Sequence, residues 1–155
     1  QKMKGNAMKT AIIGSRTITD VNLENYIPKE TDEIISGGAV GVDTLAREYA
    51  KRHGLRLTEF LPEYERYGRG APIVRNDEII KAADIVLAFW DGKSHGTKYV
   101  IDKCRRLGVR VKIIVRCEGG DALCETEYLP FTRSMYRKIC ENPPSETGEK
   151  KNKRA

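Results

Sequence analysis

The stretch "IISGGAVGVDTLAREYAKRHG", residues 34–54, indicates the fold most clearly. Two isoleucines run into Ser36 and a pair of glycines, which predicts a buried strand that ends in a turn. From Val42 onward, apolar side chains recur at i, i+3, i+4, i+7 and i+8, the single stripe of an amphipathic helix. Basic residues fill the last turn of that helix and Gly54 follows it, which is typical of a helix C-terminus.

Short apolar segments alternate with helical patterns along the rest of the chain. The expected strands are 9–14, 32–38, 55–62, 84–90 and 109–115, and the expected helices are 19–27, 42–54, 73–83 and 97–108. Such alternation is typical of an α/β protein whose parallel sheet is covered by helices on both faces. We therefore expect a single three-layer domain with a mainly parallel sheet of about five or more strands. The segment after Val115 is expected to add an edge strand and a short helix around 132–140.

The length of 155 residues fits about one domain. Residues 1–7 are interpreted as a tag or ragged start, 8–140 as the folded domain, and 141–155 as a disordered basic tail. The net charge is +6, but residues 8–140 hold 22 basic and 19 acidic side chains, a surplus of only +3. This distribution gives weak support for a basic nucleic-acid-binding face.

No apolar run approaches the ~20 residues that span a bilayer, and no signal-peptide pattern is visible. We therefore expect a cytoplasmic protein with no membrane association. Four cysteines occur, none in a C-x-x-C pair: Cys104, Cys117, Cys124 and Cys140. Reduced thiols are the prediction in such a chain. Because the cysteine spacings are wide and His53 and His95 lie elsewhere, no metal site is expected, and no cofactor is assigned.

Three predicted strand ends carry residues suited to binding an anion. They are Gly14-Ser15-Arg16, residues 35–43 and residues 89–98. In a parallel sheet such ends open on one edge, where ligands bind. Glycines let the backbone approach a ligand, and the amides of a helix start attract phosphate. The first cradle is predicted at Gly37, Gly38 and Gly41, the second at Gly96 and Thr97, with Arg16 and Arg75 adding charge-assisted bonds.

The acidic and aromatic candidates are open to different interpretations. Asp43 suits the helix dipole as well as a ligand. Asp91 opens a polar loop and is a candidate acceptor for a ribose hydroxyl or a base. Trp90 is expected to be half core and half pocket wall, and His95 to be exposed. The sequence contains neither the G-x-G-x-x-G dinucleotide fingerprint nor a P-loop.

Four segments in order resemble the YspA-type members of the SLOG superfamily: "IIGSRTITD", "IISGGAVGVDTLAREYAKRHG", "YGRGAPIVRNDEII" and "ADIVLAFWDGKSHGTKYVIDKCRRLG". The resemblance covers roughly residues 9–115 and implies a Rossmann-like fold whose pocket binds a nucleotide or a nucleotide-derived small molecule. The positions that it implies for the pocket are Gly14, Ser15, Arg16, Ser36, Gly37, Gly38, Gly41, Asp43, Arg75, Asn76, Asp91, Gly92, Ser94, Gly96 and Thr97.

The same superfamily includes the LONELY GUY phosphoribohydrolases, and the chain departs from their pattern. Those enzymes carry a Pro-Gly-Gly-x-Gly-Thr turn and then a glutamate that helps to cleave the N-glycosidic bond. Here the loop reads "DGKSHGT" and Val100 stands at the glutamate position. Asp102 lies two residues further, about 200° around a helix. Catalytic residues therefore stay unassigned, with Asp43 and Asp91 as the carboxylates available for such chemistry.

Three functions remain open from the sequence. The first is a sensor or sequestering module for a nucleotide, and the second is a nucleotide phosphoribohydrolase. The third is single-stranded nucleic-acid binding, because the superfamily also includes DNA-processing recombination mediators. The candidate nucleic-acid-binding surface comprises Tyr64, Arg66, Tyr67 and Arg69. The alternative interpretation of this segment is a solvated loop that closes over the pocket. A homodimer or higher oligomer is expected, with candidate contacts at Tyr99, Ile101 and residues 120–140.

Overall fold

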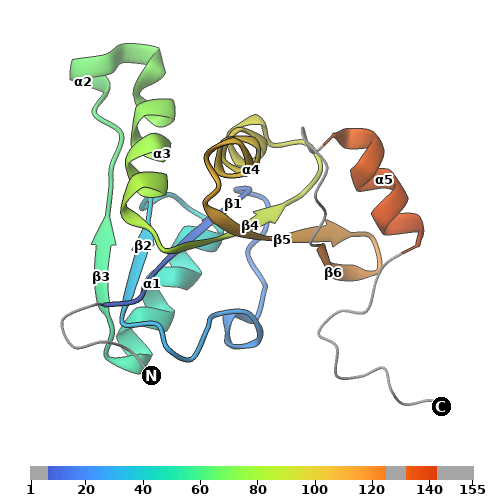
Figure 1. Ribbon diagram of the computed structural model, residues 1–155, viewed down its shortest axis with the longest axis horizontal. Coiled ribbons are helices and arrows are strands. Elements are labelled where there is room, and N and C mark those ends of the chain that lie inside the picture. Colours follow the sequence, from blue (N-terminus) through green and yellow to red (C-terminus); the bar gives the residue numbers. More distant parts are fainter. Residues whose placement is uncertain (1–6, 125–131, 143–155) are drawn as a thin grey trace.

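The computed structural model describes residues 7–124 and 132–142 (Figure 1). Its sheet has six strands in the order β3-β2-β1-β4-β5-β6. The strands are β1 (Lys9–Gly14), β2 (Glu33–Ser36), β3 (Arg56–Glu59), β4 (Ile85–Trp90), β5 (Arg110–Cys117) and β6 (Gly120–Cys124). All neighbouring strands pair in parallel except β5 and β6, which are antiparallel. The predicted α/β class and the mainly parallel sheet are confirmed.

Helices lie on both faces of this sheet. They are α1 (Val42–His53), α2 (Tyr64–Tyr67), α3 (Ala71–Ala82), α4 (His95–Leu107) and α5 (Arg133–Glu141), with 3₁₀ turns η1 (Leu23–Asn25) and η2 (Gly68–Gly70). Successive side chains of a strand point to opposite faces. Accordingly, Leu87 of β4 packs in one core cluster with Ala46 of α1, whereas Val86 packs in another with Ile79 of α3 and Val100 of α4.

Strand β4 lies in the middle of the sheet and is its most apolar strand. All six residues of "IVLAFW" are buried. A strand buried on both faces reads as a continuous apolar run, because each face meets a layer of helices. The ends of β1 and β4 therefore lie side by side in the middle of the sheet, with Gly14 opposite Phe89.

Three local predictions need correction. Residues 19–27 form only the 3₁₀ turn η1, and Pro28, whose ring disfavours the helical conformation at Ile27, ends the segment. The segment 63–72 is expected from its sequence to be a turn-rich loop, but its residues 64–70 form α2 and η2. Helix α3 begins at Ala71, and Pro72 is accommodated in its first turn, where its missing N–H has no helical partner.

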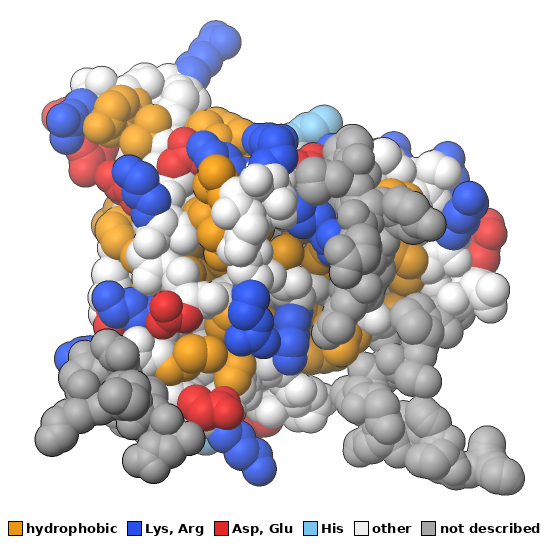
Figure 2. Space-filling model, in the orientation of Figure 1, with side chains coloured by type: hydrophobic (Ala, Val, Ile, Leu, Met, Phe, Trp, Pro, Cys, Tyr) orange, Lys and Arg blue, Asp and Glu red, His pale blue; other side chains and the backbone are white. Residues whose placement is uncertain are grey.

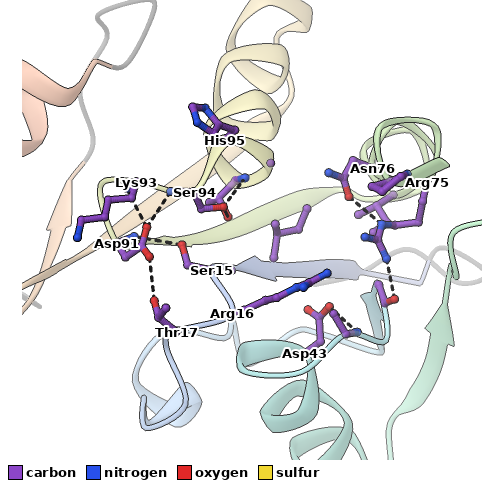
Figure 3. A pocket seen from close by; sticks show the side chains of 18 residues that line it. Ser15, Arg16, Thr17, Asp43, Arg75, Asn76, Asp91, Lys93, Ser94 and His95 are labelled. Atoms are coloured by element: carbon purple, nitrogen blue, oxygen red, sulfur yellow. Dashed lines mark hydrogen bonds between the residues drawn. The ribbon is translucent and has the colours of Figure 1, made fainter. Parts of the chain in front are cut away.

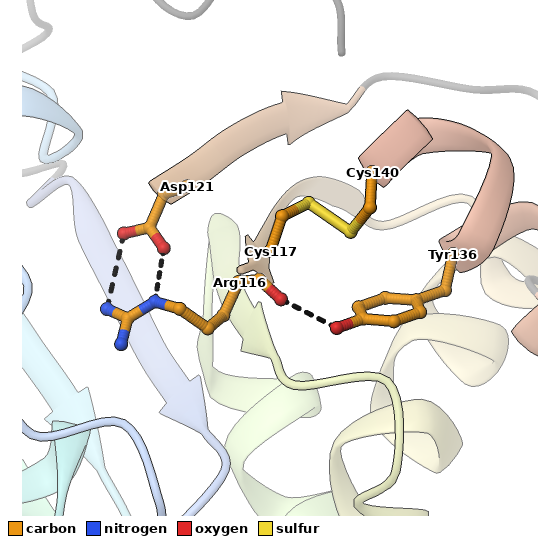
Figure 4. Close-up of a disulfide and its surroundings, with 5 residues drawn as sticks. All are labelled: Arg116, Cys117, Asp121, Tyr136 and Cys140. Atoms are coloured by element: carbon orange, nitrogen blue, oxygen red, sulfur yellow. Dashed lines mark hydrogen bonds and ion pairs between the residues drawn. A yellow bond between two sulfur atoms is a disulfide. The ribbon is translucent and has the colours of Figure 1, made fainter. Parts of the chain in front are cut away.

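The prediction of reduced thiols is wrong for one pair of cysteines. Cys117 at the end of β5 and Cys140 in α5 form a disulfide (Figure 4). The β5–β6 hairpin and α5 bring together two cysteines 23 positions apart, which spacing alone does not reveal. Cys104 is a free buried thiol, and burial raises its pKa to about 12.

The predicted edge strand and final helix are present as β6 and α5. Most of the two predicted tail segments, residues 1–6 and 143–155, lies outside the described residues. In the part of the chain that the structure describes, no helix has the length and apolar character needed to cross a membrane.

Candidate functional site

A cavity of about 520 Å³ opens where β1, β2 and β4 end (Figure 3). This volume lies within the range of about 300–1,000 Å³ typical of small-molecule sites. The loops after these three strands form its walls together with the first half of α3. The cavity thus occupies the edge of the sheet at which parallel α/β proteins bind ligands.

Eleven of the fifteen predicted site residues line this cavity: Gly14, Ser15, Arg16, Gly37, Asp43, Arg75, Asn76, Asp91, Ser94, Gly96 and Thr97. They come from strand ends that are far apart in the sequence, so the expectation that these ends meet on one edge agrees with the geometry. The other lining residues, which the sequence did not single out for the pocket wall, are Ile13, Thr17, Ala39, Pro72, Ile79, Lys93 and His95.

The four remaining predicted residues lie in the turns but do not line the cavity: Ser36, Gly38, Gly41 and Gly92. The Ser36 hydroxyl accepts the amide of Gly38 at 3.3 Å. Gly41 has a φ of +83°, and a Cβ there would lie 2.9 Å from the Arg16 carbonyl oxygen. Gly92, with a φ of +84°, faces the ring of Tyr136. These residues support the pocket without lining it.

The first turn, residues 37–41, is held by Asp43 from the start of α1. The Asp43 carboxylate accepts the amide of Ala39 at 3.0 Å, and its side chain is buried. Burial raises the pKa of Asp43, and the nearby Arg75 guanidinium only partly offsets this effect. Asp43 is therefore a pocket carboxyl group whose protonated form is favoured relative to an exposed aspartate.

Arg75 ties the first turn to α3. Its Nη1 donates to the Gly37 carbonyl at 2.7 Å, and its Nε donates to the Asn76 side-chain oxygen at 2.9 Å. Burial lowers the pKa of Arg75, and Asp43 acts in the opposite direction. Two of its donor atoms are thus engaged by the protein, so its first role is to position the turn rather than to hold a ligand.

Asn76 directs a donor into the cavity. The residue is buried, and its Nδ2 lies 3.9 Å from the position of a Cβ built on Gly96. Within residues 7–124 and 132–142, no acceptor bonds to this nitrogen. In Figure 3 the Asn76 amide nitrogen points across the cavity toward the start of α4.

Arg16 is the second uncommitted donor. Its side chain is exposed and lies along the cavity, with the guanidinium directed toward Asp43 and Arg75 (Figure 3). Among the described residues it has no hydrogen-bond or ion-pair partner. A free guanidinium in such a place is a strong partner for phosphate.

The second turn, residues 91–94, is organised by Asp91. Its Oδ1 accepts the amides of Lys93 and Ser94, each at 2.9 Å, and its Oδ2 accepts the Thr17 hydroxyl at 2.8 Å. Burial raises the pKa of Asp91, but these hydrogen bonds outweigh it and the net shift is downward. Asp91 is therefore an ionised residue that holds the turn, although the sequence suggested a ligand acceptor.

The start of α4 presents backbone amides to the same cavity. Ser94 caps the helix, since its hydroxyl accepts the amide of Thr97 at 3.3 Å. The earlier amides of the first turn, at His95 and Gly96, have no acceptor within a helix. The missing side chain at Gly96 leaves open space, with only Asn76 within 4 Å of a Cβ built there. This helix start matches the geometry of anion sites.

Two expectations about neighbouring side chains change. Trp90 is 1% exposed, donates to the Ser94 carbonyl at 2.9 Å and does not line the cavity, so it belongs to the core. His95 is exposed as expected but also lines the cavity, as does Lys93. A signal for both was present in the sequence, because they occupy the loop between Asp91 and Gly96.

The position of the phosphoribohydrolase glutamate holds no acid. Val100 is fully buried, and the Asp102 carboxylate pairs with Lys98 at 2.7 Å rather than lining the cavity. Within the described residues, no group of three or more His, Cys, Asp or Glu side chains is placed to hold a metal ion.

The aromatic segment considered for nucleic-acid binding lies on α2 and η2 and outside the cavity lining. Tyr64 and Tyr67 are 56% and 37% exposed, and the Arg66 guanidinium lies 5.1 Å from the Tyr67 ring centroid. Figure 2 shows basic side chains dispersed among acidic and apolar ones on the face in view, without a continuous basic stripe.

Comparison with known proteins adds one relationship. No protein-family model matches the chain, and no solved structure matches it. The gene 61 protein of Mycobacterium phage D29 is 33% identical over 84 residues, which cover 50% of this chain and 67% of the phage protein. The α/β chain described here therefore belongs to the family of that phage protein. Because its name carries no activity, function has to be argued from the pocket.

Proposed function

We propose that the protein binds a nucleotide or a nucleotide-derived small molecule as a sensor or sequestering module. One observation carries the proposal: Arg16, the Asn76 amide and the first turn of α4 face one cavity at the carboxyl edge of the sheet. A phosphate satisfies all three groups, because it offers several acceptor oxygens and negative charge. The apolar side chains of Ile13, Pro72 and Ile79 then favour the sugar or base.

The resemblance of residues 9–115 to YspA-type SLOG proteins supports the same ligand class. It implies a single three-layer Rossmann-like domain, and the helices on both faces of the mainly parallel sheet are compatible with it. We propose as well that the chain works as a homodimer or larger assembly in the cytoplasm. The Rossmann-like domain, the oligomeric state and the location are therefore parts of the proposal.

The proposal is tested by thermal unfolding in the presence of AMP, ADP-ribose, NAD and cyclic nucleotides. A ligand that binds only the folded state stabilises it by RT ln(1 + [L]/Kd), about 2.7 kcal/mol at one hundred times its Kd, and therefore raises the unfolding midpoint. Sodium chloride at equal ionic strength is the control for general salt effects. An unchanged midpoint with every nucleotide contradicts the proposal.

A second candidate, cleavage of an N-glycosidic bond, is favoured by the contrast between two pocket carboxyl groups. Asp43 has a raised pKa through burial, whereas hydrogen bonds lower the pKa of Asp91. Paired acids with diverging pKa values are typical of acid–base catalysis. In this scheme water adds to the sugar carbon as the base leaves with the proton of Asp43, and the proton that the water loses returns Asp43 to its protonated form.

Incubation with purine and pyrimidine nucleoside monophosphates, followed by chromatography for free base, tests this candidate. The expected result is base release that Asp43→Asn reduces at least tenfold, in the range of general acid catalysis. Protein that binds the nucleotide but releases no base is a binding module without this activity.

A further inference from the structure

Helix α5 packs directly against the second turn of the pocket. Arg133 Nε donates to the Gly92 carbonyl at 2.9 Å. A Cβ on Gly92 would lie 2.6 Å from the Tyr136 ring, so the backbone of the turn packs closely against that ring. The same ring meets Trp90 edge to face with centroids 5.6 Å apart. The conformation of residues 91–94 therefore depends on where α5 lies.

The Cys117–Cys140 disulfide joins α5 to the end of β5 (Figure 4). No residue of α5 is fully buried, and its apolar side chains are only partly covered by the sheet. The Tyr136 hydroxyl donates to the Arg116 carbonyl at 2.8 Å, one residue before Cys117. The covalent bond and this hydrogen bond fix α5 to the end of β5.

The disulfide is placed so that a reductant can reach it. Cys117 and Cys140 are both partly exposed, in contrast to the fully buried thiol of Cys104. Disulfides in reducing compartments are usually transient and redox-sensing. Exposed disulfides are more often labile and regulatory than buried ones, and this one joins a small helix without a fully buried residue to the sheet.

We infer that Cys117 and Cys140 form a thiol–disulfide modification site that sets the conformation of residues 91–94, and through them the ligand affinity of the pocket. The affinity part rests on the proposed function. The reductant is a dithiol of the thioredoxin type in chemical class. One of its thiolates attacks a protein sulfur, the S–S bond breaks and a mixed disulfide forms. Its second thiol then displaces the remaining protein thiol.

The step balances as a transfer of two electrons and two protons. The protein ends with two thiols, and the reductant ends as a disulfide. The covalent bond between α5 and β5 is then gone, and the contacts of Arg133 and Tyr136 with the second turn weaken. The amides of that turn become more accessible, and the oxidised protein is the tighter-binding form.

The test compares full-length protein oxidised in air with protein reduced by dithiothreitol. Hydrogen exchange followed by mass spectrometry reports the amides of residues 91–97, and calorimetry reports AMP binding. Reduction should speed exchange in residues 91–97 and weaken AMP binding about three- to tenfold, as expected for the loss of about one hydrogen bond. Exchange in the first turn, residues 37–41, should stay unchanged.

Three variants separate redox control from simple destabilisation. Cys117→Ser combined with Cys140→Ser should behave as the reduced form in either buffer. Arg133→Gln keeps the disulfide but removes the bond to Gly92, so its exchange in residues 91–97 should rise even when oxidised. Cys104→Ala, which changes the buried free thiol, should keep the full redox response and serves as the matched control.

Two results overturn the inference. One is a protein whose mass shows free thiols at both positions after oxidation. The other is an oxidised and a reduced form with equal exchange rates in residues 91–97. If exchange responds to redox state but AMP binds neither form, the structural coupling stands and the nucleotide proposal fails, so the two ideas are tested separately.

Discussion

The polar side chains of the pocket fall into two groups, those whose hydrogen-bonding atoms already have partners in the protein and those whose atoms have none among the described residues. Arg75 donates to Gly37 and Asn76, and both Asp91 oxygens accept hydrogen bonds from the protein. Arg16 and the Asn76 Nδ2, by contrast, bond to no described residue. Groups of the first kind keep the cavity in shape, and groups of the second kind are available to a ligand.

Gly96 should tolerate a larger side chain structurally but not functionally. A Cβ there points into open space, so Gly96→Val should leave the free energy of unfolding within about 1 kcal/mol of the wild type, since valine and glycine differ by less than this in helix propensity. The valine would occupy the space next to the α4 amides. We expect loss of AMP binding by calorimetry with normal urea unfolding. Wild-type affinity in this variant would place the ligand elsewhere.

Asp43 and Asp91 should change stability with pH in opposite directions. The folded pKa of Asp43 is raised above 3.8, so its contribution is full below that pH and is lost as pH rises through the folded pKa. The folded pKa of Asp91 is lowered below 3.8, so its contribution is present above that pH and is lost as pH falls through the folded pKa.

Urea unfolding from about pH 3 to about pH 7 measures this contrast in the Asn variants. The stability of Asp43→Asn relative to the wild type should rise with pH, whereas that of Asp91→Asn should fall. If the stability relative to the wild type changes with pH in the same direction in both variants, the environments of Asp43 and Asp91 do not shift their pKa values in opposite directions.

At the scale of elements, the turns before α1 and α4 give the pocket its form. Gly41 starts α1 with a φ of +83° beneath the Arg16 backbone. The first turn and the Gly14–Arg16 segment consequently meet at backbone contact. A side chain at this point would separate the two strand ends that share the cavity.

Gly41→Ala should destabilise the protein more than Gly54→Ala, its matched control. Both glycines have positive φ, which costs alanine about 1–2 kcal/mol, but a Cβ at Gly54 meets nothing within 4 Å. At Gly41 the Cβ would press on a carbonyl oxygen, so we expect about 2–4 kcal/mol in urea unfolding. Equal losses in the two variants would contradict the close backbone contact.

Much of this arrangement could be predicted from sequence, because regular patterns mark buried elements. The apolar run of β4 and the stripe of α1 indicated a parallel sheet, and the order of the strands brought three marked ends together. Which of these residues face the cavity could not be predicted. The sequence predicts that Gly38 and Gly92 bind a ligand, but they face Leu61 and Tyr136 respectively. Both contacts are set by tertiary packing.

The C-terminal part of the domain was the least predictable. Residues 120–141 have weak periodicity, and a disulfide between distant positions joins α5 to β5. Cysteine spacing and the expected reducing environment both pointed to free thiols. Contacts such as that of Arg133 with the Gly92 carbonyl depend on tertiary geometry that no local pattern encodes.

For the whole molecule, the disulfide should contribute to global stability. It closes a loop of 23 residues, which in the chain-entropy account is worth about 3 kcal/mol. The Cys117→Ser, Cys140→Ser double variant should therefore unfold at lower urea concentration than the oxidised wild type. Reduced wild type should match the variant. Identical midpoints for oxidised and reduced protein would show that α5 unfolds independently of the domain.

The central claim is that one cavity at the carboxyl edge of the sheet holds a phosphate-bearing ligand. Titration of ¹⁵N-labelled protein with AMP, followed by amide chemical shifts, tests it most directly. The account predicts saturable shifts concentrated at Arg16, Gly37, His95, Gly96 and Thr97, with little change on α2 and β6. Shifts that fail to appear, or that gather on α2 instead, would contradict it.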